Sequence, residues 1–151
     1  ALPIFQSKNI EKNNEYIIRF ISQPLRELSF SSSNQNSRFK IPKLDQHVIF
    51  SKFYLGLLPK ITNNFKKIII NPHPAEDKLS SRKWVNLKRR FYNSNILIEK
   101  FDHELIMKNE LIFGFNSIAL LKSSTKAFMT YSLCDYVSWG EKLPHKQIKN
   151  L

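Results

Sequence analysis

The stretch KKIIINPHPAEDK, residues 66–78, decides the fold expected for this chain. Its centre, residues 68–70, is an uninterrupted run of isoleucine. Apolar runs without alternation are typical of strands buried on both faces, as in parallel sheets. The run then meets Pro72-His73-Pro74, in which both prolines fix φ and lack a backbone N–H donor. We therefore expect a buried parallel strand whose end presents His73 in extended geometry.

Strand-type and helix-type segments alternate around this strand. Strand patterns occupy residues 15–22, 95–100, 110–115 and 126–133. Helical patterns occupy residues 43–65, 80–93, 102–109 and 116–124. In the first of these, Pro59 is expected to end or kink the helix, and His47 to lie on its solvent-facing side. The alternation predicts an α/β, Rossmann-like domain over residues 1–151, with a mainly parallel sheet and helices on both faces.

Composition excludes several classes of protein. The hydrophobic fraction of 42% and the aromatic fraction of 13% suit one globular domain and exclude a disordered chain. Three glycines leave no G-x-G-x-x-G or P-loop pattern. A single cysteine, Cys134, and scattered histidines predict neither a metal site nor a disulfide, and we interpret Cys134 as a buried structural thiol. The first residues lack the basic and apolar regions of a signal peptide.

The net charge of +12 is large for 151 residues. It favours nucleic acid, an anionic membrane surface or an acidic substrate as a partner, or else a solvated basic surface. The densest basic cluster covers residues 82–90. Since no recognition helix or aromatic RNA-binding motif is evident, nucleic acid ranks behind the other partners.

His73 is the first candidate for chemistry. Ligands of open parallel sheets bind at the carboxyl ends of the strands, where His73 is expected to lie. An imidazole with an ordinary pKa of about 6.5 can donate to a phosphate or protonate a leaving oxygen. Glu76 and Asp77 follow it and would orient the histidine, hold a sugar hydroxyl or cap the next helix. The alternative is a solvent-exposed histidine in a turn.

The second candidate is Gly114-Phe115-Asn116-Ser117, where a strand passes into a helix. A helix N-terminus offers N–H groups to a phosphate, and Ser117 adds a hydroxyl. Gly114 lets a ligand or a neighbouring backbone approach closely. The alternative is an ordinary helix cap. If both segments lie at one edge of the sheet, a nucleotide would span them.

The residues FISQPLREL (20–28), IIINPHPAEDK (68–78) and FGFNSIALL (113–121) together resemble bacterial sialyltransferases. The similar groups are the lipooligosaccharide sialyltransferases of glycosyltransferase family 52 and the polysialyltransferases. Gln23 belongs to a matching QPL loop, His73-Pro74 to a His-Pro motif, and Ser117 to a serine motif. The resemblance covers about residues 16–121. It implies the donor-binding, carboxy-terminal half of a GT-B glycosyltransferase that uses CMP-sialic acid.

The resemblance also implies roles for residues. Transfer to a glycan or glycolipid hydroxyl would be inverting and independent of metal or other cofactor, with His73 as general acid or phosphate donor. The nucleotide would be held by Gln23, Pro74, Glu76, Gly114, Asn116 and Ser117. The enzyme would work in the bacterial cytoplasm, in peripheral contact with the inner membrane.

Two departures from the pattern bear on activity. Ile118 stands where the serine motif has a second serine or threonine, and the acidic motif of the family, a pair of Asp/Glu followed by Gly, is absent. The chain is therefore expected to be a domain of a longer enzyme or a degenerate relative that is inactive alone. Two other functions stay open: a transferase domain that uses CDP-glycerol, and a basic module that binds nucleic acid or anionic lipid.

Overall fold

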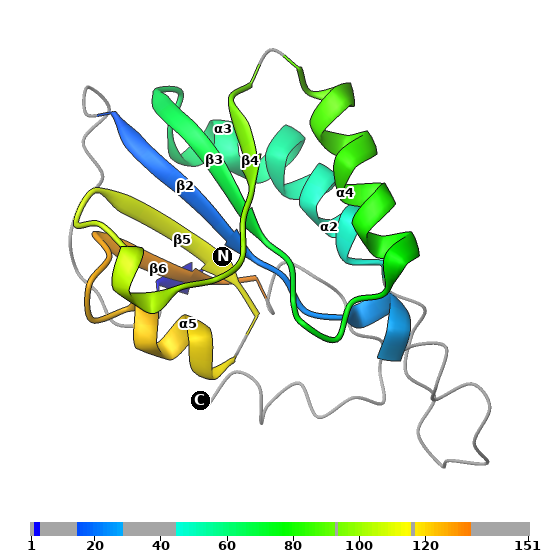
Figure 1. The fold of residues 1–151 in the computed structure, drawn as a ribbon. Helices are drawn as coiled ribbons and strands as arrows, with labels where there is room; N and C mark the ends of the chain where they lie inside the picture. Colours follow the sequence, from blue (N-terminus) through cyan, green and yellow to red (C-terminus); the bar gives the residue numbers. More distant parts are fainter. Residues whose placement is uncertain (1, 4–14, 29–44, 93, 116, 134–151) are drawn as a thin grey trace.

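A six-stranded sheet forms the centre of the chain (Figure 1). The structure is a computed structural model that describes residues 2–3, 15–28, 45–92, 94–115 and 117–133. The strand order is β1-β6-β5-β2-β3-β4. The strands are β1 (Leu2–Pro3), β2 (Tyr16–Ile21), β3 (Phe65–Asn71), β4 (Ile96–Ile98), β5 (Glu110–Gly114) and β6 (Met129–Ser132). Cys134, predicted to be a buried thiol, and Asn116 lie outside the described residues.

The strand directions confirm the predicted α/β, mainly parallel sheet. β2 pairs in parallel with β3 on one side and β5 on the other, while β4 and β6 extend the sheet in parallel outward. Only the short β1 runs antiparallel, against β6. The chain therefore builds outward from β2 to β3 and β4, then returns across β2 to β5 and β6. This reversal places a topological switch point at the carboxyl ends of β2 and β5.

Helices cover both faces of the sheet, as the sequence predicts. One face carries α2 (Gln46–Lys52), the π-helical turn η1 (Phe53–Leu57), α3 (Leu58–Ile61) and α4 (Lys78–Arg90) (Figure 1). The other face carries the 3-10 turn η2 (His103–Leu105) and α5 (Ile118–Ser123). Asp77, Asp102 and Ser117 are the N-caps of α4, η2 and α5, and each side chain accepts a backbone N–H of its helix.

The first helical segment differs in detail from the prediction. It is interrupted by the π-helical turn η1, which ends directly before α3, whose first turn contains Pro59. Proline lacks an N–H and its ring crowds the carbonyl four residues earlier, so a widened turn accommodates Pro59 without ending the helix. Val48 is 51% exposed, whereas Phe50 is fully buried.

The prediction that His47 lies on the surface is wrong, because the imidazole is only 5% exposed. Its Nδ1 lies 2.7 Å from Asp45 Oδ1, and its Nε2 lies 3.0 Å from the carbonyl oxygen of Ser80. The ring also packs against Trp84, with centroids 4.3 Å apart. The helical pattern of residues 43–65 could not reveal this burial, since it is the neighbouring helix α4 that packs against the His47 side of α2.

An aromatic core fills the space between the sheet and the α2–α4 layer. Phe20 of β2 contacts Phe50, Phe53 and Trp84 with ring centroids 5.2–6.0 Å apart. The opposite face has a smaller aliphatic cluster of Ile21, Ile106, Ile112 and Leu120. Strand residues alternate between these two cores, so β2 and β5 are fixed from both sides.

Candidate functional site

A cavity of about 460 Å³ lies at the carboxyl ends of four parallel strands. Each strand contributes the residues that follow it: β2 gives Ser22 and Gln23, β3 gives His73, β4 gives Lys100, and β5 gives Ser117. The remaining lining residues are Ile21, Asn71, Pro72, Pro74, Phe101, Ile118 and Ala119. Because the chain reverses across β2, loops far apart in sequence meet at this one edge.

Four predicted site residues therefore lie together: Gln23, His73, Pro74 and Ser117 all line this cavity. The hypothesis that the imidazole of His73 and the hydroxyl of Ser117 share one edge of the sheet agrees with this geometry. Of the other predicted residues, Glu76 and Gly114 do not line the cavity, and Asn116 is outside the described residues.

His73 is half-buried and its ring has a defined tautomer when neutral. Its Nδ1 accepts a hydrogen bond from the backbone N–H of Ala75, at 3.0 Å. The proton of the neutral imidazole therefore resides on Nε2. In the turn that follows β3, the backbone N–H of Glu76 also donates to the carbonyl of His73, at 2.9 Å. The ring can thus present an Nε2–H donor to an anion in the cavity.

The Glu76 carboxylate fixes the turn after β3 that carries His73, which we call the histidine turn. One oxygen of its carboxylate accepts the backbone N–H of His73. The other accepts the indole N–H of Trp84 at 2.9 Å and the side-chain amide of Gln46 at 2.8 Å. Both carboxylate oxygens are therefore occupied within the protein. These contacts favour a role in orienting the histidine over the predicted role in binding the nucleotide. Glu76 positions the backbone of His73.

A polar network extends from Gln46 to the loop after β2. The Gln46 side chain also bonds to Glu27 and Ser80, at 3.2 and 3.3 Å. Burial opposes the ionisation of Glu27, but hydrogen bonds from Ser80 and Gln46 outweigh it and lower the pKa of the Glu27 carboxyl. Arg26, in the helical turn of residues 25–28 that follows β2, forms an ion pair with Asp77 at the start of α4. The network ties the segment after β2 to the loop that carries His73.

Ser117 stands at the start of α5 and is half-buried. Its hydroxyl oxygen accepts the backbone N–H of Leu120 at 3.2 Å, so the ordinary capping role is present. The hydroxyl proton can still donate to a ligand, since a hydroxyl donates and accepts at once. The neighbouring Ile118 is 72% exposed and lines the same cavity, which gives the ligand an apolar surface.

Gly114 serves the packing of the backbone. A Cβ at this position would lie 3.1 Å from the carbonyl oxygen of Ile21 and 3.2 Å from a methyl group of Leu120. The sequence predicted that either a ligand or a neighbouring backbone approaches this glycine closely. In the structure the neighbouring backbone of β2 does so. Gly114 thereby allows α5 to pack closely on β2 and β5 beside the cavity.

Sequence analysis missed Asn71 and Lys100, which also line the cavity. The Asn71 side chain accepts from Arg19 Nη1 at 2.9 Å and donates to the carbonyl of Glu99 at 2.8 Å. Arg19 is 3% exposed and forms a bidentate pair with the equally buried Glu110. Arginine in a β-branched strand is a signal for such a partner, but the partner lies 91 residues away and the sequence does not identify it.

Neither a metal site nor a membrane-spanning helix is found in the part of the chain that the structure describes. These residues contain no group of three or more His, Cys, Asp or Glu side chains placed to hold a metal ion. None of their helices combines the length and the hydrophobicity needed to cross a bilayer.

Comparisons with known proteins return no match, whether with protein-family models, with curated proteins or with solved structures. The cavity and the residues that line it therefore carry the functional inference.

Proposed function

We propose that this chain binds the cytidine nucleotide of CMP-sialic acid in the cavity at the strand ends, as the donor-binding domain of a sialyltransferase. The observation that carries the proposal is the meeting of His73, Ser117 and Lys100 around one cavity. An imidazole N–H, a hydroxyl and an ammonium group suit a phosphate. The cavity volume of about 460 Å³ lies within the range of roughly 300–1,000 Å³ that is usual for small-molecule sites.

The proposed chemistry follows from the placement of these groups. An acceptor hydroxyl attacks the anomeric carbon of the sialic acid, and the bond from that carbon to the phosphate oxygen breaks. CMP leaves with the electron pair of that bond, and the acceptor proton passes to a general base that the resemblance assigns to the acidic motif of the other half of the enzyme. Nε2–H of His73 donates to the departing phosphate, while Ser117 and Lys100 stabilise its charge. The identity of the sugar and the inverting outcome come from the resemblance of the motifs.

The apolar and amide side chains that line the cavity would contact the base and the sugar of the donor. Phe101 and Ile118 line the cavity and offer apolar surface to a base or a sugar ring. Gln23 offers both donors and an acceptor, as a polar edge of cytosine or a sugar hydroxyl requires. The proposed setting is the bacterial cytoplasm, in peripheral contact with the inner membrane.

Calorimetry with CMP, CMP-sialic acid and CDP-glycerol tests the proposal. We expect CMP-sialic acid to bind, and His73→Ala and Ser117→Ala each to weaken binding roughly 10- to 100-fold, because each removes a hydrogen bond to a charged group. Matched controls are His103→Ala and Ser81→Ala, whose side chains lie outside the cavity lining. Tighter binding of CDP-glycerol would reassign the donor. Absence of binding by all three at millimolar concentration would refute the proposal.

A further inference from the structure

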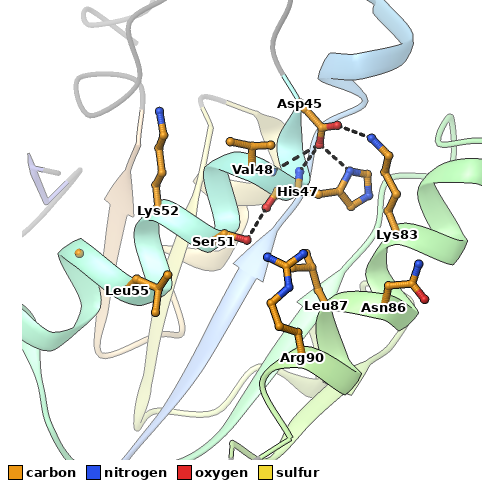
Figure 2. Close-up of a pocket in the computed structure, with 11 residues that line it drawn as sticks. Asp45, His47, Val48, Ser51, Lys52, Leu55, Lys83, Asn86, Leu87 and Arg90 are labelled. Carbon is orange, nitrogen blue, oxygen red and sulfur yellow. Dashed lines mark hydrogen bonds and ion pairs between the residues drawn. The ribbon is translucent and has the colours of Figure 1, made fainter.

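A second and larger cavity, of about 660 Å³, lies between α2 and α4 and shares no residue with the first. One wall consists of Val48, Ser51, Lys52, Leu55 and Gly56, and the facing wall consists of Lys83, Asn86, Leu87 and Arg90 (Figure 2). Asp45 and His47 complete the lining of the cavity. The two walls follow the i, i+3, i+4, i+7 spacing of single helix faces. We refer to this cavity as the α2–α4 groove.

The charge of the groove is positive. Three cationic side chains line it, Lys52, Lys83 and Arg90, against one carboxylate, Asp45. That carboxylate is engaged by Lys83 at 2.5 Å and by His47 at 2.7 Å. The α4 helix adds further positive charge outside the groove lining, since its sequence contains no acid and also carries Lys78, Arg82, Lys88 and Arg89. The groove is therefore complementary to an anion.

The groove also exposes aliphatic side chains beside its cations. Val48 is 51% exposed and Leu55 is 65% exposed, both from the α2 side (Figure 2). Val85, on the same α4 helix, is 42% exposed. An amphipathic face with Lys and Arg beside apolar residues matches the boundary between the headgroups and the acyl chains of a bilayer. A nucleic acid would use the cations and leave these aliphatic side chains in water.

We propose that the α2–α4 groove binds the headgroup of an anionic phospholipid and holds the domain against a membrane surface. The headgroup phosphate lies beside Arg90, on the α4 wall of the groove. Leu55 and Val48 contact the glycerol and upper acyl region. Since the groove contains no residue of the strand-end cavity, this proposal is independent of the nucleotide that the cavity binds.

Co-sedimentation with vesicles tests the proposal. The full chain is mixed with vesicles of phosphatidylglycerol and phosphatidylcholine, and with vesicles of phosphatidylcholine alone. We expect binding only to the anionic vesicles. Arg90→Glu should lower the partition coefficient about 25-fold, because reversal changes the charge by two and each charge near an anionic surface contributes about fivefold. Leu55→Ser should lower it about tenfold through lost apolar contact.

Matched controls separate the groove from a generally basic surface. Arg89→Glu makes the same two-charge reversal in the same exposed last turn of α4, outside the groove lining. Because Arg89 would not lie at the headgroup, only its weaker, more distant attraction is reversed, and binding should fall no more than about fivefold. Leu105→Ser alters a leucine that is 63% exposed on η2, against 65% for Leu55, and should change binding less than twofold. Circular dichroism of each variant verifies the fold.

Several results would overturn the proposal. Equal losses in Arg90→Glu and Arg89→Glu would assign binding to diffuse charge, and no effect of Leu55→Ser would exclude apolar contact. Saturable binding of glycerol phosphate without vesicle binding would indicate a soluble anion. Tighter binding of an oligonucleotide or of polyglutamate than of vesicles, lost equally in Arg90→Glu, would assign the groove to another polyanion.

Discussion

Replacing Glu76 tests whether the structure holds His73 in place for a ligand. In Glu76→Gln the side-chain shape is kept, but one oxygen becomes an NH₂ group. One carboxylate oxygen now serves two donors, Trp84 and Gln46, and the other serves the backbone N–H of His73. The glutamine carbonyl should therefore stay with the two donors, and its NH₂ group should face the His73 N–H. The substitution thus breaks the contact to the histidine turn selectively.

The magnitudes follow from these bonds. A hydrogen bond to a charged group contributes about 1.5–3 kcal/mol, so Glu76→Gln should lower the free energy of unfolding by about 1.5 kcal/mol. Glu76→Ala also strands the indole N–H of Trp84, which is fully buried. Gln46 keeps Glu27 and Ser80 as other partners. The alanine variant should therefore lose about 3 kcal/mol.

Two assays read out these effects. Urea unfolding followed by circular dichroism gives the loss of stability, and calorimetry with CMP gives the loss of affinity, which we expect to be about tenfold for Glu76→Gln. Nitrogen chemical shifts of the His73 ring report whether Nε2 still carries the proton. Glu104→Gln is the control, because that carboxylate is on η2 and its side chain is 81% exposed.

Either of two results would refute the reasoning. A Glu76→Gln variant that loses stability while keeping full affinity and the same ring tautomer would show that Glu76 only supports the fold. Unchanged stability in Glu76→Ala would show that its hydrogen bonds contribute nothing net.

Three further substitutions have defined outcomes. Arg19→Met should cost about 3–5 kcal/mol in urea unfolding because it leaves the Glu110 carboxylate buried and unpaired, and Arg19→Met with Glu110→Leu should recover most of it; a double variant as unstable as the single one would contradict this. Burial raises the pKa of Tyr131 to about 12, aided by Tyr16. The unfolded phenol ionises near pH 10 and the folded phenol near pH 12, so stability is complete below pH 10 and falls as pH rises to 12. Tyr131→Phe should flatten that alkaline loss by about 2–3 kcal/mol in pH-dependent denaturation, and an unchanged slope would exclude Tyr131 as its source. Gly114→Ala should destabilise by about 1–3 kcal/mol through overpacking against Ile21 and leave the mode of CMP binding intact; a loss of binding at unchanged stability would instead place a ligand at this position.

The strands and caps were predictable because their causes are local. The isoleucine run before His73 forms β3, and Asp77 and Ser117 begin helices by accepting nearby N–H groups. Such features depend on residues within a few positions of one another. The meeting of His73 and Ser117 was also accessible, since the parallel strand order alone brings the carboxyl ends of strands to one edge.

The features that sequence analysis missed or misjudged depend on contacts distant in sequence. His47 is polar and follows the solvent-facing pattern of its own helix, yet its ring is buried by Ser80 and Trp84 of α4. The pair of Arg19 and Glu110 joins β2 to β5 across 91 positions. The sequence left Glu76 open between orienting the histidine and binding the ligand, and two of the partners that favour the first role, Gln46 and Trp84, come from other segments. No periodicity in one segment encodes a partner supplied by another.

The two proposals can be tested separately because α4 keeps their sites apart. The helix begins at Lys78, directly after the loop that carries His73, and ends at Arg90 in the groove. At 1.5 Å per residue its 13 residues extend about 20 Å. The Debye length at physiological salt is about 8 Å, so a charge reversal at Arg90 is largely screened at the strand-end cavity. The hydrogen bond that joins α4 to the histidine turn comes from Trp84, whose indole is buried and does not line the groove. Arg90→Glu should therefore lower vesicle partitioning about 25-fold while CMP affinity stays within twofold, and Glu76→Gln should lower CMP affinity about tenfold while vesicle partitioning stays within twofold. Joint loss in either variant would mean that α4 transmits changes between its two ends, and the sites would then have to be treated as one coupled unit.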